Sequence, residues 1–460
     1  MTNGKQINNQ TTEDIYNSKD YKRSRKAYCM DCAFEYFVAL MVSDTFLAML
    51  LRTIGASENM IVIMSSLISL AFLFQFFAVF VVQRICNTKR FVIIFHFASQ
   101  MVFMSLYLIP LFAKGLSPSV RNVIAIFGIL AAYFGNYFVT SMIYRWGNSY
   151  VHPTRRARYS ATKEMISLMS GAFVTIIVGL VMDVFTVDTM VDGAKKEMLS
   201  TGGLIFAAIA IFIFALCDLI CLLLIKNDIK PKVEKKDRVK VTDAFRNTLG
   251  NKKFRNVIYL TILYNVAIYT TVGSMGAYKL DLFGGVKLIS AVLGVNLFAQ
   301  IVNNLGVLSR FALSKPFGRY SDKRSYAKGI ELALIIAIFA FGINIFSTPS
   351  TWFLVIIFTI LYHVCQAGTS ANMLNITYNY VEEKYFVQAS AIKNSIGGVC
   401  GFTAGCLASM LVGAMEGGKE FLGVTIYAPQ LLSLISCGIM IVAFLFTRFV
   451  IEKQEKESKI

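Results

Sequence analysis

The sequence has little charge for its length. Only 16% of its 460 residues are Asp, Glu, Lys or Arg, whereas 56% are hydrophobic. A soluble protein of this size needs a far more charged surface, so the composition excludes that class. Runs of about 20 apolar residues recur along the whole chain, and such runs can cross a bilayer as helices. The sequence therefore predicts an integral membrane protein.

The sequence also lacks the common motifs of catalysis and nucleotide binding. It has no Walker-type GK[ST] loop, no HExxH and no GxSxG, which excludes an ATP-driven pump within this chain and leaves a membrane-embedded hydrolase as the only residual enzyme. Most of the nine cysteines fall inside apolar segments, and Cys29 and Cys32 have no second pair with which to form a zinc or redox site. We expect no catalytic residues, no cofactor and no metal site.

Apolar segments are the main feature that is present. They do not alternate apolar and polar residues as the strands of a membrane β-barrel do, so we interpret them as helices. The twelve predicted helices cover residues 28–51, 61–83, 91–112, 121–144, 161–182, 202–225, 256–279, 288–312, 328–346, 351–378, 389–413 and 422–447.

A repeat divides the chain at half its length. Tyr150-Val151 and Ser160-Ala161-Thr162-Lys163 recur 230 residues later as Tyr380-Val381 and Ser390-Ala391-Ile392-Lys393. The same offset pairs Gly171 with Gly401. Doubled membrane bundles of this kind are typical of solute transporters. We predict an all-α protein of two pseudo-symmetric six-helix bundles.

Charged segments separate and orient the bundles. The predicted parts are a tail at 1–27, a bundle at 28–225, a basic linker at 226–254, a bundle at 255–447 and a tail at 448–460. A short amphipathic helix is expected at Val241–Leu249. With an inside N-terminus, only eight Lys and Arg lie outside: Arg52, Lys114, Arg121, Lys195, Lys196, Lys279, Lys287 and Lys419. This bias predicts a multi-pass cell-membrane protein with both termini in the cytoplasm, and it explains the net charge without nucleic-acid binding.

The turn after the eighth predicted helix carries a specific motif. It reads Pro316-Phe317-Gly318-Arg319-Tyr320-Ser321-Asp322-Lys323-Arg324, with an acidic residue four positions after a glycine and basic residues beyond it. This resembles the signature loop of the major facilitator superfamily (MFS), which lies between the second and third helices of each half. In the first half, Lys89 and Arg90 remain but the glycine and the aspartate do not. The stretch ending at Arg158 resembles the loop after the family's fourth helix.

The resemblance implies a gating motif and a central cavity. The gating residues would be Gly318, Arg319, Asp322, Lys323, Arg324, Lys89, Arg90 and Arg158. An Asp322 ion pair could hold the two halves together in one state, and the alternative is an ordinary solvated turn. In the superfamily, helices 1, 4, 7 and 10 line the cavity.

Carboxylates inside the membrane are candidates for ion coupling, because charge is costly there. The first predicted helix carries Asp31, Glu35 and Asp44, and Glu35 lies deepest. Asp31 and Asp44 have the alternative of reaching water at the two ends, and Glu35 has the alternative of pairing with a neighbouring helix. Asp218 is a further carboxylate in the sixth helix.

Polar stripes mark the expected substrate cavity. Amides, hydroxyls and aromatic rings suit a polar organic solute, although such residues also bind helices together. The predicted cavity residues are Glu35, Tyr133, Asn136, Tyr137, Thr140, Thr261, Asn265, Tyr269, Gln300, Asn303, His363, Gln366 and Ser370.

These features predict a monomeric secondary transporter in the lipid bilayer. It would move a small polar organic solute by alternating access, with proton or sodium symport. One alternative is a proton-coupled exporter of drug-like compounds. Another is a transporter-like membrane sensor without flux.

Overall fold

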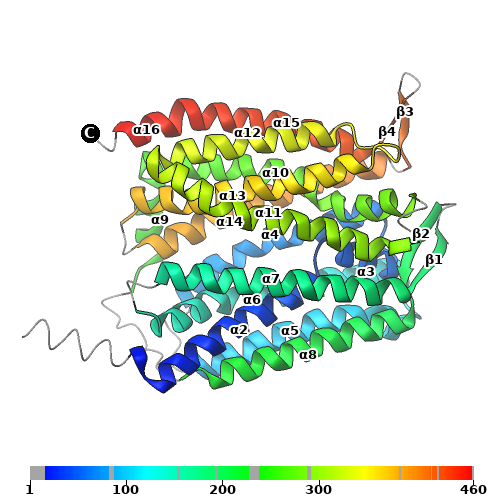
Figure 1. Ribbon diagram of the computed structural model, residues 1–460, viewed down its shortest axis with the longest axis horizontal. Helices are drawn as coiled ribbons and strands as arrows, with labels where there is room; N and C mark the ends of the chain where they lie inside the picture. Colours follow the sequence, from blue (N-terminus) through cyan, green and yellow to red (C-terminus); the bar gives the residue numbers. More distant parts are fainter. Residues whose placement is uncertain are drawn as a thin grey trace, which may run out of the picture.

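The computed structural model describes residues 16–81, 88–152, 156–191, 194–226, 238–286, 292–382, 385–415, 417–421 and 424–457. Most of them lie in long helices that run along the longest axis of the molecule (Figure 1). Two short β-hairpins mark one end of the helices and the C-terminus lies at the other. We call these the hairpin end and the terminus end.

The two halves of the chain form two groups of long helices. The first half contains, in order, α2 (Lys19–Met41), α3 (Asp44–Ile54), α4 (Glu58–Val81), α5 (Thr88–Phe112), α6 (Pro118–Ser149), α7 (Arg156–Val184), β1 (Thr186–Val191), β2 (Ala194–Leu199) and α8 (Thr201–Leu224). The second half contains α10 (Lys252–Gly284), α11 (Val295–Lys323), α12 (Tyr326–Asn344), α13 (Phe353–Tyr380), α14 (Phe386–Ala414), β3 (Lys419–Phe421), β4 (Val424–Ile426), α15 (Ala428–Phe446), a π-helical turn (Thr447–Ile451) and α16 (Glu452–Glu457). Helix α9 (Val241–Leu249) lies between them and has the bounds predicted for the amphipathic helix.

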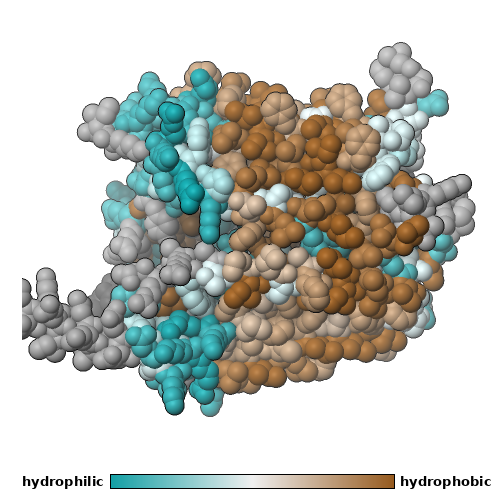
Figure 2. All heavy atoms as spheres, in the orientation of Figure 1, coloured by the Kyte–Doolittle hydropathy of each residue, from teal (hydrophilic) through white to brown (hydrophobic). Residues whose placement is uncertain are grey.

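The helix count agrees with a membrane bundle. By length and composition, eleven segments of the described chain can cross a membrane if α2 and α3 form one bent span. Helix α11 is the twelfth long segment, and its Asn, Gln, Ser, Arg and Lys side chains make it less apolar. Hydrophobic side chains cover most of the visible face, while hydrophilic ones gather at the terminus end (Figure 2). The predicted all-α architecture of two bundles is confirmed.

The helix starts that differ most from the predictions are those of α2 and α11. Helix α2 begins at Lys19 instead of residue 28, with Ser18 accepting a hydrogen bond from the Tyr21 N–H. Helix α11 begins at Val295 instead of 288 and continues to Lys323. Gly294 has a φ of 77°, which favours glycine, and the new helix start is capped from the other half of the chain by Asp183. Neither the Ser18 cap of α2 nor the Asp183 cap of α11 can be predicted from hydropathy alone.

Glycines allow the helices of each half to pack closely. A Cβ on Gly171 would lie 2.5 Å from the Tyr36 ring of α2, and a Cβ on Gly401 would lie 2.6 Å from the Tyr269 ring of α10. The two glycines, 230 residues apart, therefore serve equivalent contacts in the two halves. Gly401, with Gly397 and Gly405, lies on the face of α14 that also packs against α4 of the first half. The internal repeat thus corresponds to repeated packing.

Candidate substrate cavity and buried acidic cluster

The first membrane segment is broken where it meets the centre of the molecule. Helix α2 ends at Met41, α3 begins at Asp44, and the two helices are bent by 46°. Asp44 has a φ of 47°, a left-handed conformation that Asp tolerates better than most residues. Irregular backbone at membrane depth is tolerated where it lines a cavity. Val42, Ser43 and Asp44 do line one.

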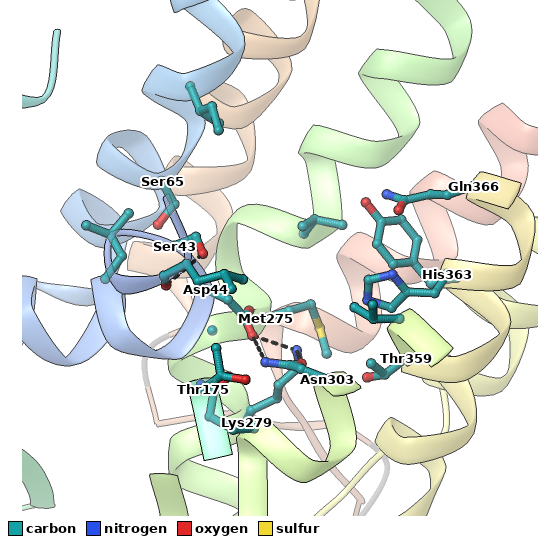
Figure 3. Close-up of a pocket in the computed structure, with 18 of the residues that line it drawn as sticks. Ser43, Asp44, Ser65, Thr175, Met275, Lys279, Asn303, Thr359, His363 and Gln366 are labelled. Atoms are coloured by element: carbon teal, nitrogen blue, oxygen red, sulfur yellow. Dashed lines mark hydrogen bonds and ion pairs between the residues drawn. The ribbon is translucent and has the colours of Figure 1, made fainter. Parts of the chain in front are cut away.

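That cavity lies between the two halves of the chain. Its volume is about 340 Å³, and its lining comes from α2, α3, α4, α6 and α7 on one side and from α10, α11 and α13 on the other. Figure 3 shows His363 and Gln366 of α13 facing Ser43 and Asp44 across it. A cavity of this size suits a small organic molecule.

A polar bridge crosses the cavity wall. The Asp44 carboxylate accepts a hydrogen bond from Lys279 Nζ at 3.0 Å and another from Asn303 Nδ2 at 2.6 Å (Figure 3). Lys279 also donates to Asn303 Oδ1 at 2.7 Å. Asp44 belongs to the first half and the other two belong to the second. This pair therefore joins the halves through a charge-assisted contact.

Six of the predicted cavity residues line this space: Tyr133, Tyr269, Gln300, Asn303, His363 and Gln366. Three others, Thr261, Asn265 and Ser370, line a second cavity of about 210 Å³. Glu35, Asn136, Tyr137 and Thr140 are not among the lining residues of either cavity. The predicted polar residues of α10 and α13 therefore line two cavities, one helical turn apart. Asn136, Tyr137 and Thr140 of α6 line neither cavity.

The second cavity lies about one helical turn from the first, on the side of the terminus end. Tyr269 lines the first cavity and Asn265, one turn earlier on α10, lines the second. On α13, Gln366 and Ser370 repeat this relation. The second cavity also contains Lys393 of α14, which the sequence analysis did not assign to any site.

Ion pairs close the hairpin end. Arg52 is buried and donates to Glu58 at 3.1 Å and to Asp281 of the other half at 2.8 Å. Lys196 of β2 pairs with the same Glu58 at 2.9 Å. The Asp183 carboxylate, at the end of α7, accepts the N–H groups at the start of α11. The Arg52–Asp281 pair and the Asp183 contacts join the two halves at this end of the molecule, and we call them the seal.

A second acidic site is buried within the first half. His96 Nε2 lies 2.8 Å from Asp218 Oδ2, and one ligand atom from each of Asp31, His96 and Asp218 lies within 4.8 Å of the others. All three side chains are at most 1% exposed. Among the described residues, both Asp31 oxygens, His96 Nδ1 and Asp218 Oδ1 lack a hydrogen-bond partner. The sequence predicts no metal site, whereas these three residues form a group that can hold a cation or share a proton.

Glu35 lies one turn beyond Asp31 and next to the same cluster. Its electrostatic neighbours are His96, Asp218 and Lys163, and the Asn136 amide is its hydrogen-bonding neighbour. Lys163 of α7 donates to the Tyr28 hydroxyl at 3.1 Å and lies over the Tyr28 and Tyr144 rings. Glu35 and Asn136, predicted as cavity residues, therefore belong to this part of the first half.

The gating residues lie on helix ends. The motif expected in a turn occupies the last turns of α11, which runs through Lys323. Asp322, Lys323 and Arg324 are exposed, and Asp322 forms no ion pair with any described residue, so a latch there stays a prediction. In the first half, Lys89 donates to the carbonyls of Leu223 and Ile225 at the end of α8.

The remaining gating residues contribute little to the described geometry. Gly318 has open space where a Cβ would be, and Arg319 and Arg90 are exposed. The side chain of Arg158 lies outside the described residues.

Known structures share this architecture. A mutant of the nucleoside transporter NupG superposes with a TM-score of 0.66 at 15% identity, covering 93% of this chain and 100% of that one. A bacterial homologue of the lysosomal transporter Spinster, in an inward-facing state, gives 0.59 at 14% identity, with 95% and 98% covered. A bacterial homologue of the iron transporter ferroportin gives 0.56 at 12% identity, with 94% and 98% covered. No family model matches the sequence, and no curated protein matches it.

These structures are transporters of the MFS fold. The likeness extends over nearly the whole length of each chain, so the present chain has that fold. The resemblance drawn from the motif after the eighth helix is confirmed at this level.

Proposed function

We propose that this protein is a secondary transporter that moves a small polar organic solute by alternating access, together with protons. The observation that carries the proposal is the polar cavity between two pseudo-symmetric halves. Its hairpin end is closed by ion pairs that join the halves. Such pairs can form in one state and break in the other, as alternating access requires.

The buried acidic cluster supports a proton as the coupling ion. Sodium prefers a full set of oxygen ligands, whereas this site combines an imidazole with two carboxylates. The 2.8 Å contact between His96 and Asp218 has the length of a charge-assisted hydrogen bond. Two buried carboxylates and one imidazole carry no net charge with two protons bound and one negative charge with one. Loss of a proton would therefore disfavour the buried state.

Other titratable groups lie close to this cluster. They include Glu35, Cys32 and Tyr28 of α2, Cys221 of α8 and Lys163 of α7. Glu35 and Asp31 therefore remain our proposed coupling residues, now together with His96 and Asp218. Asp44 is paired with Lys279, which gives it a bridging role at the cavity.

The test is solute uptake into proteoliposomes under an imposed pH gradient. Asp218→Asn is expected to abolish accumulation against a gradient while solute exchange at equal pH survives, because exchange needs no proton release. Gradient-driven accumulation by a folded Asp218→Asn variant would contradict proton coupling at this site. So would a stoichiometric divalent metal bound by the wild type and absent from the variant.

Two other functions make different predictions. An exporter of drug-like compounds would move its compound out of the proteoliposomes while protons enter, opposite to the direction expected of a symporter. A membrane sensor would bind a solute in the cavity and move none. The same proteoliposomes test both functions when the compound is placed either inside or outside and its movement is measured.

A further inference from the structure

The second cavity contains a buried cation without a counter-ion. Lys393 is 6% exposed, and its Nζ has the Thr377 hydroxyl at 3.3 Å as a hydrogen-bonding neighbour. Among the described residues no carboxylate forms an ion pair with it. A charged side chain inside a membrane bundle is expensive unless something pairs with it.

The surroundings of Lys393 are built for a polar ligand. The cavity of about 210 Å³ is lined by Thr261, Asn265, Thr369, Ser370 and Asn394, together with the rings of Phe72 and Tyr264 and the side chain of Met373. The Thr261 and Thr369 hydroxyls donate to helix carbonyls. The amides of Asn265 and Asn394 and the Ser370 hydroxyl can donate to a ligand, and no lining residue is acidic. Donors around an ammonium group are the environment that a carboxylate or a phosphate requires.

The equivalent lysine of the first half differs. Lys163 lies 230 residues earlier and is half-buried, with its charge over the Tyr28 and Tyr144 rings and acidic groups nearby. The first half thus carries the acidic cluster, whereas the lysine of the second half has no ion-pair partner among the described residues. The two halves share a fold but differ in the charged groups around the two equivalent lysines.

We infer that the solute is an organic anion whose carboxylate or phosphate group pairs with Lys393. The inference rests on the proposed transport function, because the second cavity lies one helical turn from the first along α10 and α13. The anionic end would lie at Lys393, and the polar remainder would extend toward Tyr269 and Gln366. Protons moving with the anion would offset its charge.

Thermal unfolding of the purified full-length protein tests the anion site directly. Acetate and inorganic phosphate serve as probes at constant ionic strength, with chloride as the reference. Wild type is expected to gain a few degrees in Tm in a saturable way. Lys393→Met is expected to unfold at higher Tm than wild type without probe, since an unpaired buried charge is gone, and to bind the probes about tenfold more weakly or worse. Lys393→Arg should keep part of the response.

Lys315→Met is the matched control, because Lys315 is exposed on α11 of the same half. It should respond to the probes as wild type does. Equal responses in wild type and Lys393→Met, or no response in wild type, would overturn the anion site.

Matched solutes separate this inference from the proposed function. Glycerol and glycerol 3-phosphate, glucose and gluconate, and uridine and uridine monophosphate are compared for binding and for uptake. We expect binding and uptake of anionic members only, both dependent on Lys393. Uptake of neutral members that is unaffected by Lys393→Met would overturn the inference and leave transport intact. Lys393-dependent binding of anions without any uptake would support the anion site and contradict transport.

Discussion

At the scale of single residues, the structure shows the surroundings of charged groups that could not be predicted from the sequence. Glu197 of β2 is an example, since its Oε2 has no hydrogen-bond partner among the described residues and Gly284 of the other half lies beside its carboxylate. Burial, followed by the carboxylates of Asp183 and Asp188, raises the pKa of Glu197 to about 7, although Arg52 acts in the opposite direction. The ordinary value is 4.5.

This shift predicts a pH dependence at the hairpin end. Between about pH 4.5 and 7 the folded protein binds more protons than the unfolded chain, so its stability falls as the pH rises through that window and is level above it. Glu197→Gln should remove this decline. Glu420→Gln, on the exposed β3 strand, is the control and should keep it. The measurement is Tm from pH 4.5 to 8, and parallel curves for wild type and Glu197→Gln would contradict the prediction.

Arg52 gives a second prediction at this scale. Arg52→Met removes the partner of Asp281, which is half exposed, while Glu58 keeps Lys196; the loss should weaken the seal by about 1 kcal/mol, or roughly fivefold in the population of the open state. A cysteine at Ser65, which lines the cavity, should then react faster with a charged thiol reagent added at the hairpin end. Arg246→Met on α9 is the control. Unchanged labelling in Arg52→Met would show that these pairs do not hold the seal.

At the scale of elements, glycine decides how closely the halves approach. A Cβ on Gly398 of α14 would collide with the backbone carbonyl of Ser69 on α4. Gly398→Ala should therefore destabilise the protein by about 1–3 kcal/mol. Gly438→Ala on α15, where the added Cβ meets nothing within 4 Å, should be neutral or slightly stabilising because alanine favours helix. Denaturation of both variants in detergent measures this, and equal effects would contradict the packing argument.

The sequence predicts the helices better than it predicts the contacts between them. Apolar runs indicated the helices, and α9 was expected with its observed bounds. The capped start of α11 was missed, because Asp183 lies more than a hundred residues away in the chain. The α6 stripe was assigned to the cavity, yet Asn136 is next to Glu35, since a polar stripe cannot tell a cavity from a neighbouring helix. For Lys393 the sequence offers one indication, its position in the internal repeat, and the repeat alone does not predict a binding role.

At the scale of the whole molecule, the orientation stays a prediction from the distribution of Lys and Arg. It places the hairpin end outside and the terminus end in the cytoplasm, so the sealed structure would face inward. A cysteine at Val187 of β1 should react with an impermeant reagent added to intact cells, and a cysteine at Lys456 of α16 should react only after the cells are opened. Both positions are exposed, and labelling is compared with the parent chain. The reverse pattern would invert the topology.

The central claim is that this fold moves a solute and protons together. The most direct measurement is internal pH in vesicles that contain the protein and a pH-sensitive dye, after addition of each member of the matched solute pairs. We predict that an anionic solute which stabilises the protein also acidifies the interior, and that Asp218→Asn and Lys393→Met each abolish this proton entry. A solute that binds through the cavity residues but produces neither proton entry nor its own uptake would contradict the account.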